Sequence, residues 1–108
     1  MGRGLARFVV FDVETTGLYV DKGHRVIEIG AVAVRGTEMG EEFQSLISTK
    51  APISKTVRKI HGITPDMLVG QPDAKEVLTR FKDFVGESTL VAHNAAFDVG
   101  FLQRECMR

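Results

Sequence analysis

Near the start of the chain, residues 8–17 read FVVFDVETTG. Four apolar residues in a row favour a strand that is buried on both faces. Side chains alternate along a strand, so we expect Asp12 and Glu14 to point the same way. Two like charges at the edge of a core repel each other and lose solvation. A divalent cation would offset that cost, and two solvated carboxylates before a turn are the alternative interpretation.

A third carboxylate lies near the other end of the chain, where residues 89–102 read TLVAHNAAFDVGFL. The pattern predicts a short buried strand, a polar turn and a helix, with Asn94 as N-cap and Asp98 one turn into the helix. If this strand is parallel to the first and adjacent to it, their C-terminal ends lie together. Asp98 would then join Asp12 and Glu14 at the edge where open α/β sheets bind ligands.

The segments between these two stretches are typical of an α/β unit. Two further strands are expected at residues 26–34 and 42–47, separated by a hairpin turn at 36–40. Helices are expected at residues 54–60, 65–70 and 73–86, because each range begins with a capping residue or a proline. The apolar spacing of the last of these helices indicates a core-facing stripe rather than a ligand site.

Composition indicates one domain of a protein from a reducing compartment. The chain has 108 residues, of which 44% are hydrophobic, enough for a buried core. Cys106 is the single cysteine, so a disulfide framework is excluded and a cytoplasmic location is expected. The apolar runs are too short to span a membrane, so no membrane association is expected. The net charge of zero gives no global attraction to nucleic acid.

The charge distribution is uneven, however. Residues 43–65 contain no acidic residue, and the basic residues within them are Lys50, Lys55, Arg58 and Lys59. This basic segment would contact the phosphates of a bound strand. The solvated face of a short helix is an equally good interpretation.

Four motifs occur in the order DVETTG, VIEIGAVAV, HGIT and HNAAFDVGFL, and together they extend over essentially the whole chain. With these motifs the chain resembles the DEDD (DnaQ-like) exonucleases, and it is most similar to the proofreading 3′–5′ exonuclease of bacterial DNA polymerase III. The resemblance implies a ribonuclease H-like α/β fold, a mixed sheet of order 3-2-1-4-5 with helices on both faces. Residues 1–108 are then expected to be an exonuclease domain truncated at its C-terminus. The last strand and the C-terminal helices would be missing, leaving the fourth strand as an edge.

The resemblance also implies a reaction, the hydrolysis of phosphodiester bonds at DNA 3′ ends with two Mg²⁺ or Mn²⁺ ions. Asp12 would bridge both ions, Glu14 would hold the ion that activates water, and Asp98 would complete the other ion's site. The family takes its general base and a further Asp from a later H-x-x-x-x-D motif. Ten residues follow Asp98 here, and none of them is His or Asp.

Other residues are assigned to the terminal nucleotide by the same resemblance: Thr15, Thr16, Gly17, Leu18, His61 and Phe97. Each of these assignments has a structural alternative. Thr16 is as well explained by a turn, Leu18 is better explained as a core residue, and an unpaired histidine such as His61 is usually structural. His93 is expected only to set the geometry of the turn beneath the site.

The expected partners are single-stranded DNA 3′ ends and, by resemblance, a DNA polymerase subunit. RNA-directed relatives share the motifs, so an RNA substrate remains open. A catalytically incomplete module that binds nucleic acid or docks on a polymerase is the alternative from a different functional class. Outside the site, Glu28 lies among apolar residues and is expected to pair with Arg25 or Arg35 rather than to act in catalysis.

Overall fold

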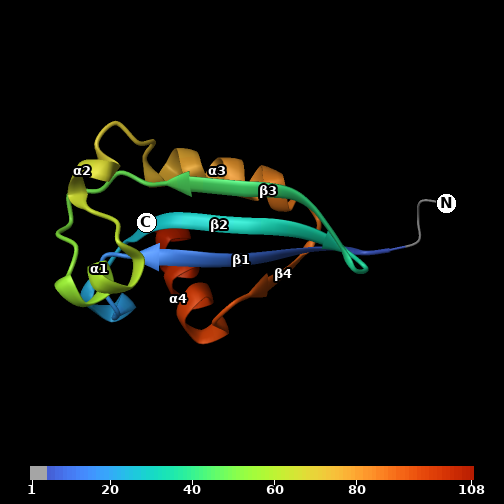
Figure 1. Cartoon of the computed structure of the whole chain (residues 1–108), viewed down its shortest axis with the longest axis horizontal. Coiled ribbons are helices and arrows are strands. Elements are labelled where there is room, and N and C mark those ends of the chain that lie inside the picture. Colours follow the sequence, from blue (N-terminus) through green and yellow to red (C-terminus); the bar gives the residue numbers. More distant parts are fainter. Residues whose placement is uncertain (1–4) are drawn as a thin grey trace.

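The computed structural model describes residues 5–108. Within them, four strands form one mixed sheet in the order β3-β2-β1-β4, with helices packed along it (Figure 1). This arrangement confirms the predicted α/β class and the predicted order of the first four strands. The elements are β1 (Arg7–Thr15), η1 (Val20–Lys22), β2 (Val26–Arg35), β3 (Glu38–Leu46), α1 (Lys55–His61), α2 (Pro65–Leu68), α3 (Ala74–Val85), β4 (Thr89–Ala92) and α4 (Ala95–Cys106).

The first three strands form an antiparallel meander. β2 ends at Arg35 and β3 begins at Glu38, so the connection is shorter than predicted, and the third strand begins earlier than the predicted Glu42. Gly36 adopts a φ of 60° in this turn, a conformation that suits a tight hairpin and favours glycine. Residues 38–42 of β3 are all exposed and three of them are Glu, so they lack the alternating burial pattern that would reveal a half-buried strand.

The two long helices, α3 and α4, lie on the same face of the sheet (Figure 1). Val9, Phe11 and Val13 of β1 point to that face and are buried against Phe81 of α3 and Phe101 of α4. The expectation that β1 is buried on both faces is wrong. Phe8, on the opposite face, is 39% exposed, because no long helix in the described part of the chain covers that side.

A β-bulge gives the other face its own small core. Glu14 is opposite Glu28, but the next residue of β1, Thr15, is opposite Val26, so Ile27 is the extra residue. Val26 joins the core beneath the long helices, whereas Ile27 points the other way and packs with residues of α1, α2 and the adjoining loops. The short helices therefore cover one end of the face that carries Glu14, and in this sense helices flank both faces as predicted.

The predicted helix starts are confirmed by their capping contacts. The Ser54 hydroxyl accepts a hydrogen bond from the Val57 amide at 3.4 Å, and the Asp73 carboxylate accepts one from the Glu76 amide at 2.9 Å. Pro65 is the first residue of α2, where the missing N–H costs nothing. These two caps set the first residues of α1 and α3.

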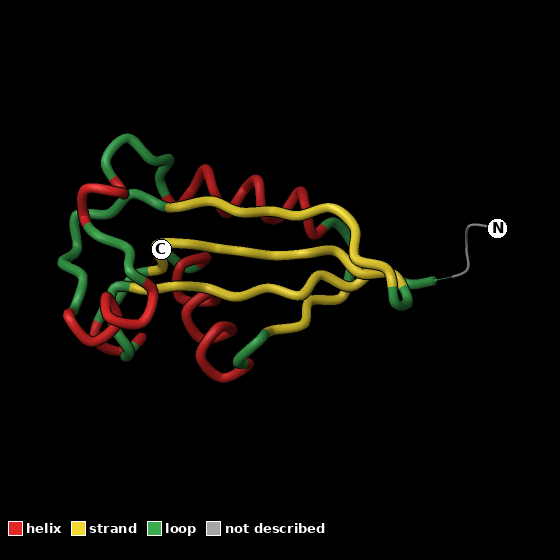
Figure 2. The backbone as a smooth tube through the Cα atoms, in the orientation of Figure 1, coloured by secondary structure: helices red, strands yellow, loops and turns green. Residues whose placement is uncertain are grey.

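The shortest strand, β4, pairs with β1 in parallel and lies at the end of the sheet within the described residues (Figure 2). The prediction that this strand is buried is wrong, because Leu90 and Val91 are each 42% exposed; the strand is the edge that the resemblance implied. In residues 5–108, none of the helices has the length and apolar character needed to cross a membrane.

Candidate active site

The site lies where β1 and β4 run side by side in parallel. Phe11 is paired with Ala92, and one residue further the His93 amide donates to the Phe11 carbonyl at 3.0 Å. The next residue of β1 is Asp12. The parallel pairing therefore places Asp12 next to His93 at the C-terminal ends of the two strands, the edge at which the sequence predicted that the carboxylates meet.

Asp12 and Glu14 project from the face opposite the long helices. The residues that alternate with them on β1 are buried, since Phe11, Val13 and Thr15 are all at most 3% exposed. Asp12 itself is exposed and Glu14 is half-buried. The two carboxylates therefore point to the same face of the sheet, as predicted.

Asp98 reaches the site from the first turn of α4 and is 1% exposed. Its Oδ2 accepts a hydrogen bond from the Asn94 amide at 2.7 Å, and its Oδ1 accepts one from the Val13 amide at 3.3 Å. Asn94 occupies the N-cap position as predicted, but its side chain makes no capping bond. The buried carboxylate of Asp98 thus links the start of α4 to β1 and is held in one orientation.

The negative charges of Asp12 and Glu14 are unfavourable in the folded protein, and this raises the pKa values of both carboxylates. Partial burial in the cleft, followed by the nearby charge of Asp98, raises the pKa of Asp12 above its ordinary value. Burial, followed by the charge of Asp12, likewise raises the pKa of Glu14. A cation between the carboxylates would reverse both effects, because an opposite charge favours the ionised forms.

One group of side chains has the spacing of a metal site. Donor atoms of Asp12, His93 and Asp98, one from each residue, all lie within 4.8 Å of one another. Carboxylate oxygens are the ligands that hard divalent cations prefer, so this donor set fits such a cation. Glu14 lies outside this group but lines the same cleft as Asp12 and Asp98. The structure thus brings the three predicted carboxylates to one edge and adds His93.

The residues that follow Glu14 make hydrogen bonds within the protein. Thr15 and Thr16 are buried, the Thr15 hydroxyl donates to the Gly17 carbonyl at 2.6 Å, and the Thr16 hydroxyl accepts from the Arg25 amide at 2.9 Å. A Cβ at Gly17 would overlap the His24 ring, so a side chain at this position requires that ring to move. The two hydroxyls therefore hold the turn in shape, and their predicted contacts with a nucleotide remain predictions.

A cleft of about 300 Å³ adjoins the carboxylates, and Leu18, His61 and Phe97 are among the residues that line it. Leu18 is 41% exposed, so its interpretation as a core residue is wrong. The Phe97 ring packs against that of Phe101, with centroids 4.7 Å apart. Leu18 and Phe97 thus present apolar surface at the opening of the site.

His61 has a defined structural role. Its Nδ1 accepts a hydrogen bond from the Ile63 amide at 2.9 Å, so its Nε2 carries the proton and donates to the Thr15 carbonyl at 3.0 Å. Both ring nitrogens are therefore engaged by the backbone. The ring still lines the cleft, and a contact with a nucleotide remains a prediction for its edge or face rather than for its nitrogens.

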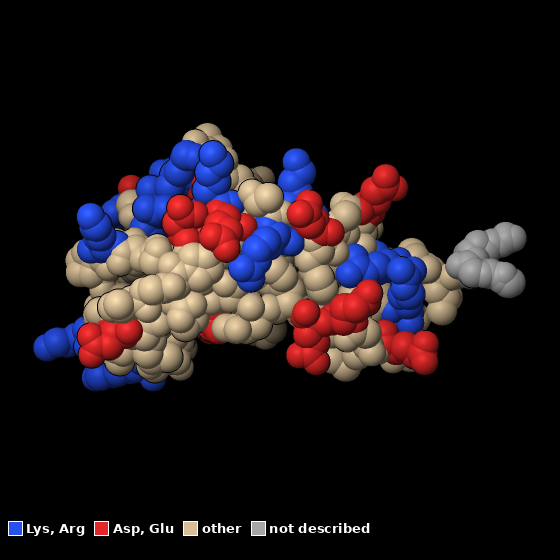
Figure 3. Space-filling view, turned by 90° about the horizontal axis from the view of Figure 1, so that it is seen from above, with Lys and Arg blue, Asp and Glu red and all other residues tan. Residues whose placement is uncertain are grey.

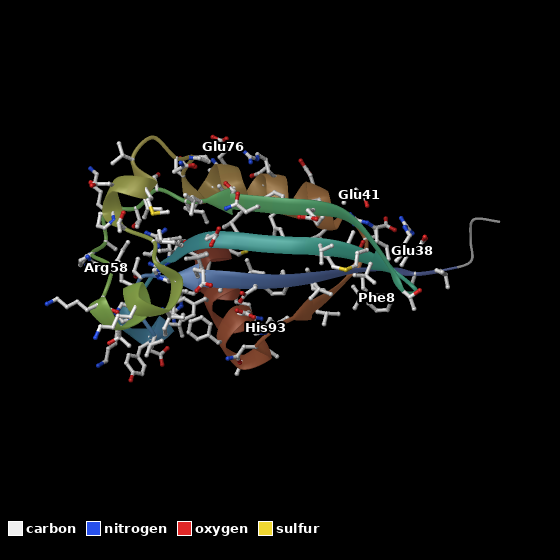
Figure 4. All side chains as sticks on the ribbon, viewed as in Figure 1. Phe8, Glu38, Glu41, Arg58, Glu76 and His93 are labelled. Atoms are coloured by element: carbon white, nitrogen blue, oxygen red, sulfur yellow. The ribbon has the colours of Figure 1, made fainter. Side chains whose placement is uncertain are left out.

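Two further sequence expectations concern charged residues. The predicted pairing of Glu28 with Arg25 or Arg35 is wrong, because Glu28 accepts from the Gln44 side chain at 2.6 Å and Arg25 binds Glu105. All the basic residues of the basic segment are exposed. Basic side chains are prominent at the end of the molecule that carries α1 and α2 (Figure 3), and Arg58 extends outward there (Figure 4).

A larger groove of about 980 Å³ lies on the face with the long helices. It is lined by α3 and α4, and its two acidic residues are Asp73 and Glu105. Asp73 caps α3, and Glu105 is paired with Arg25. Since neither carboxylate is free and the two have separate partners, the chemistry of the molecule is better assigned to the smaller cleft.

Comparison with known proteins shows the family to which the chain belongs. A family model described as Exonuclease matches residues 9–108. The chain is 46% identical over 100 residues to the PolC-type DNA polymerase III of Clostridium perfringens, covering 93% of this chain and 7% of that protein. It is 45% identical over 95 residues to the same polymerase of Bacillus subtilis, covering 88% of this chain and 6% of that one. The chain therefore spans less than a tenth of these relatives.

Solved structures show the same fold. An Exonuclease X bound to 5′ overhanging duplex DNA is similar with a TM-score of 0.70 and 30% identity, covering 83% of this chain and 50% of that one. Escherichia coli Exonuclease I, in complex with a dA16 oligonucleotide, is similar with a TM-score of 0.83, covering 94% of this chain and 24% of that one. Its identity of 16% supports a shared fold only.

Proposed function

Because the chain belongs to the exonuclease family, we propose that it hydrolyses phosphodiester bonds at the 3′ ends of DNA, as the proofreading part of a replicative polymerase. The observation that carries the proposal is the meeting of Asp12, Glu14 and Asp98 at one sheet edge beside an open cleft. The PolC-type polymerase relatives support DNA as the substrate and a polymerase as the partner. Residues 1–108 would then be part of a longer exonuclease domain.

The carboxylates would hold two divalent cations, Mg²⁺ or Mn²⁺. Such ions, when bound, neutralise charge on a scissile phosphate and make a bound water more acidic. Asp12 would contact both ions, Glu14 would hold the one beside the attacking water, and Asp98 would hold the other. The two backbone amides on Asp98 keep its carboxylate oriented toward the site without a cation, so the donor set is partly preorganised.

The cleft would receive the terminal nucleotide of a single strand. The exposed Leu18 and the half-buried Phe97 offer apolar surface, on which bases stack with little sequence preference. The turn at Thr15, Thr16 and Gly17 would approach the sugar through backbone groups, because the two hydroxyls are already bonded. Lys55 and Lys59 of α1 would contact phosphates further along the strand.

One observation favours a second candidate, a module that binds nucleic acid or docks on a polymerase without cutting. The basic residues of the basic segment are all exposed, so they are available to bind the phosphates of a strand whether or not the carboxylates cut it. In that case the carboxylates would bind metal and DNA, and the strand would stay intact.

The test is degradation of a single-stranded DNA oligomer labelled at its 5′ end, in Mg²⁺, Mn²⁺ or EDTA, with a matched RNA oligomer in parallel. The proposal expects a metal-dependent ladder that shortens from the 3′ end and disappears in Asp12→Ala. Shortening of the RNA oligomer alone would show that the substrate is RNA rather than DNA. Binding of DNA without cleavage, in the chain and in a longer protein that contains it, would support the second candidate instead.

A further inference from the structure

His93 is the residue of the site that the sequence did not assign to chemistry. It follows β4 directly, and its amide is bonded to the Phe11 carbonyl in the ladder with β1. Neighbouring residues of a parallel pair carry their side chains on the same face. His93 therefore lies beside Asp12 on the open face, between β1 and α4 (Figure 4).

The spacing of the donor atoms suits coordination by one ion. One donor each from Asp12, His93 and Asp98 lie within 4.8 Å of one another, whereas two ligands about 2.1 Å from one ion are at most about 4.2 Å apart. A rotation of the exposed His93 or Asp12 side chain would bring the donor atoms within about 4.2 Å of one another. Asp98 is held by two backbone amides, so we expect the two exposed side chains, rather than Asp98, to move.

The ring of His93 is also free to bind. In residues 5–108 its ring nitrogens have no hydrogen-bond partner, unlike those of the other two histidines. His61 uses both nitrogens on backbone groups, and His24 accepts a bond from the Tyr19 amide at 3.0 Å. Among the described residues, His93 is thus the histidine with both ring nitrogens unbonded. The His24 ring has one printed bond, but it does not belong to the group with Asp12 and Asp98.

We propose that His93 is a nitrogen ligand of the metal site, completing the coordination that Asp12 and Asp98 begin. This inference rests on the proposed function, because it concerns the same metal site. Imidazole is a softer ligand than carboxylate or water and binds Mn²⁺ more readily than Mg²⁺. The site would therefore prefer Mn²⁺, and replacing the nitrogen by an oxygen ligand would move the preference toward Mg²⁺.

The test is pulsed electron paramagnetic resonance of Mn²⁺ bound to the chain, which detects a directly coordinated nitrogen without reference to activity. We expect nitrogen modulation in the unaltered chain and its loss in both His93→Ala and His93→Asp. The control is His24→Asn, because an amide oxygen can replace Nδ1 as the acceptor for Tyr19, and the modulation should persist. Titration should show Mn²⁺ affinity about tenfold lower in His93→Ala, with Mg²⁺ affinity raised relative to Mn²⁺ in His93→Asp.

The outcomes separate the inference from the function on which it rests. Mn²⁺ binding that is lost in Asp12→Asn but shows no nitrogen modulation would overturn the role of His93 and leave the metal-dependent exonuclease standing. Modulation that survives in His93→Ala would also overturn it. Failure of the chain to bind Mn²⁺ in an Asp12-dependent way would overturn the metal site and this inference together.

Discussion

The guanidinium of Arg25 binds the carboxylate of Glu105 at two points, with Nε–Oε1 at 2.7 Å and Nη2–Oε2 at 2.8 Å. The Glu105 side chain is 2% exposed, and its Oε1 also accepts the Val26 amide at 3.0 Å. This bond raises the pKa of Arg25 above its ordinary value. The contact joins the start of β2 to the last turn of α4, the helix that carries Asp98.

Removal of one member of this pair should be costly. Arg25→Ala leaves the buried Glu105 carboxylate with the Val26 amide and the more distant Arg108, whose Nε lies 3.9 Å away. It should lower the free energy of unfolding by about 3 kcal/mol, measured by urea denaturation. The matched control is Arg80→Ala, which breaks an exposed pair with Glu76 within α3 and should cost less than about 0.5 kcal/mol. Equal losses in the two variants would show that the Arg25 contact does not hold α4.

The unbalanced carboxylates predict a pH dependence in the absence of metal. The folded-state pKa values of Asp12 and Glu14 are raised by burial and by neighbouring charges, so the folded chain binds protons more tightly than the unfolded chain. Stability should therefore fall as pH rises from the ordinary carboxyl range through the raised values. Asp12→Asn should flatten this slope in thermal denaturation at a series of pH values, and a slope equal to that of the unaltered chain would contradict the assignment.

Gly17 should tolerate no side chain. Its replacement by alanine places a Cβ that would overlap the His24 ring, which must move away from its bond to Tyr19. We expect Gly17→Ala to lower stability by about 2 kcal/mol in urea denaturation. Gly30→Ala is the control, because a Cβ there meets nothing within 4 Å, and its stability should be unchanged or slightly higher. A loss at Gly30 as large as at Gly17 would exclude the steric explanation.

The basic segment should act through α1. If Lys55 and Lys59 each contact a phosphate of single-stranded DNA, the double alanine variant should weaken binding and reduce the slope of log affinity against log salt by about 1.4. Binding is measured in EDTA, so that the strand is not cut. The double alanine variant of Lys75 and Lys82, which lie on α3 beside the larger groove, should bind as the unaltered chain does. Unchanged slopes in both variants would identify the segment as a solvated helix face.

Much of the fold could be predicted because local and global signals agree. Ser54, Asp73 and Pro65 are strong start signals for helices, and the structure begins a helix after or at each of them. The apolar run before Asp12 and the strand before His93 predicted a parallel neighbour pair, which the sheet contains. The motif order identified the family, and the comparison confirms it.

What the sequence did not reveal depends on tertiary contacts. The extra residue Ile27 cannot be recognised in a run of apolar residues, because a bulge leaves no compositional mark there. Leu18 looked like core, yet it lies at the mouth of a cleft whose other wall, Phe97, comes from the far end of the chain. The partner of Glu28 could not be chosen among nearby arginines, since the register of β3 brings Gln44 alongside it.

The place of His93 was the least predictable feature of the site. Its motif position suggested a turn residue, and only the distances to Asp12 and Asp98 show that it faces the carboxylates. One signal was available, since a residue directly after a parallel strand lies level with the corresponding residue of its neighbour. The roles of the site residues in catalysis and in nucleotide binding remain predictions for the experiments above.

The bulge in β2 separates the core beneath α3 and α4 from the small core that supports the α1 side of the cleft. Because Ile27 is the extra residue, a chain that lacked it would still pair β1 with β2 in phase and keep the core beneath α3 and α4. It would lose the anchor on which α1 and α2 pack, and with it the support for His61. Loss of Ile27 would thus keep the sheet and the core beneath α3 and α4 but remove the support of the α1 side of the cleft. The sheet would therefore tolerate a change at this position better than the cleft would.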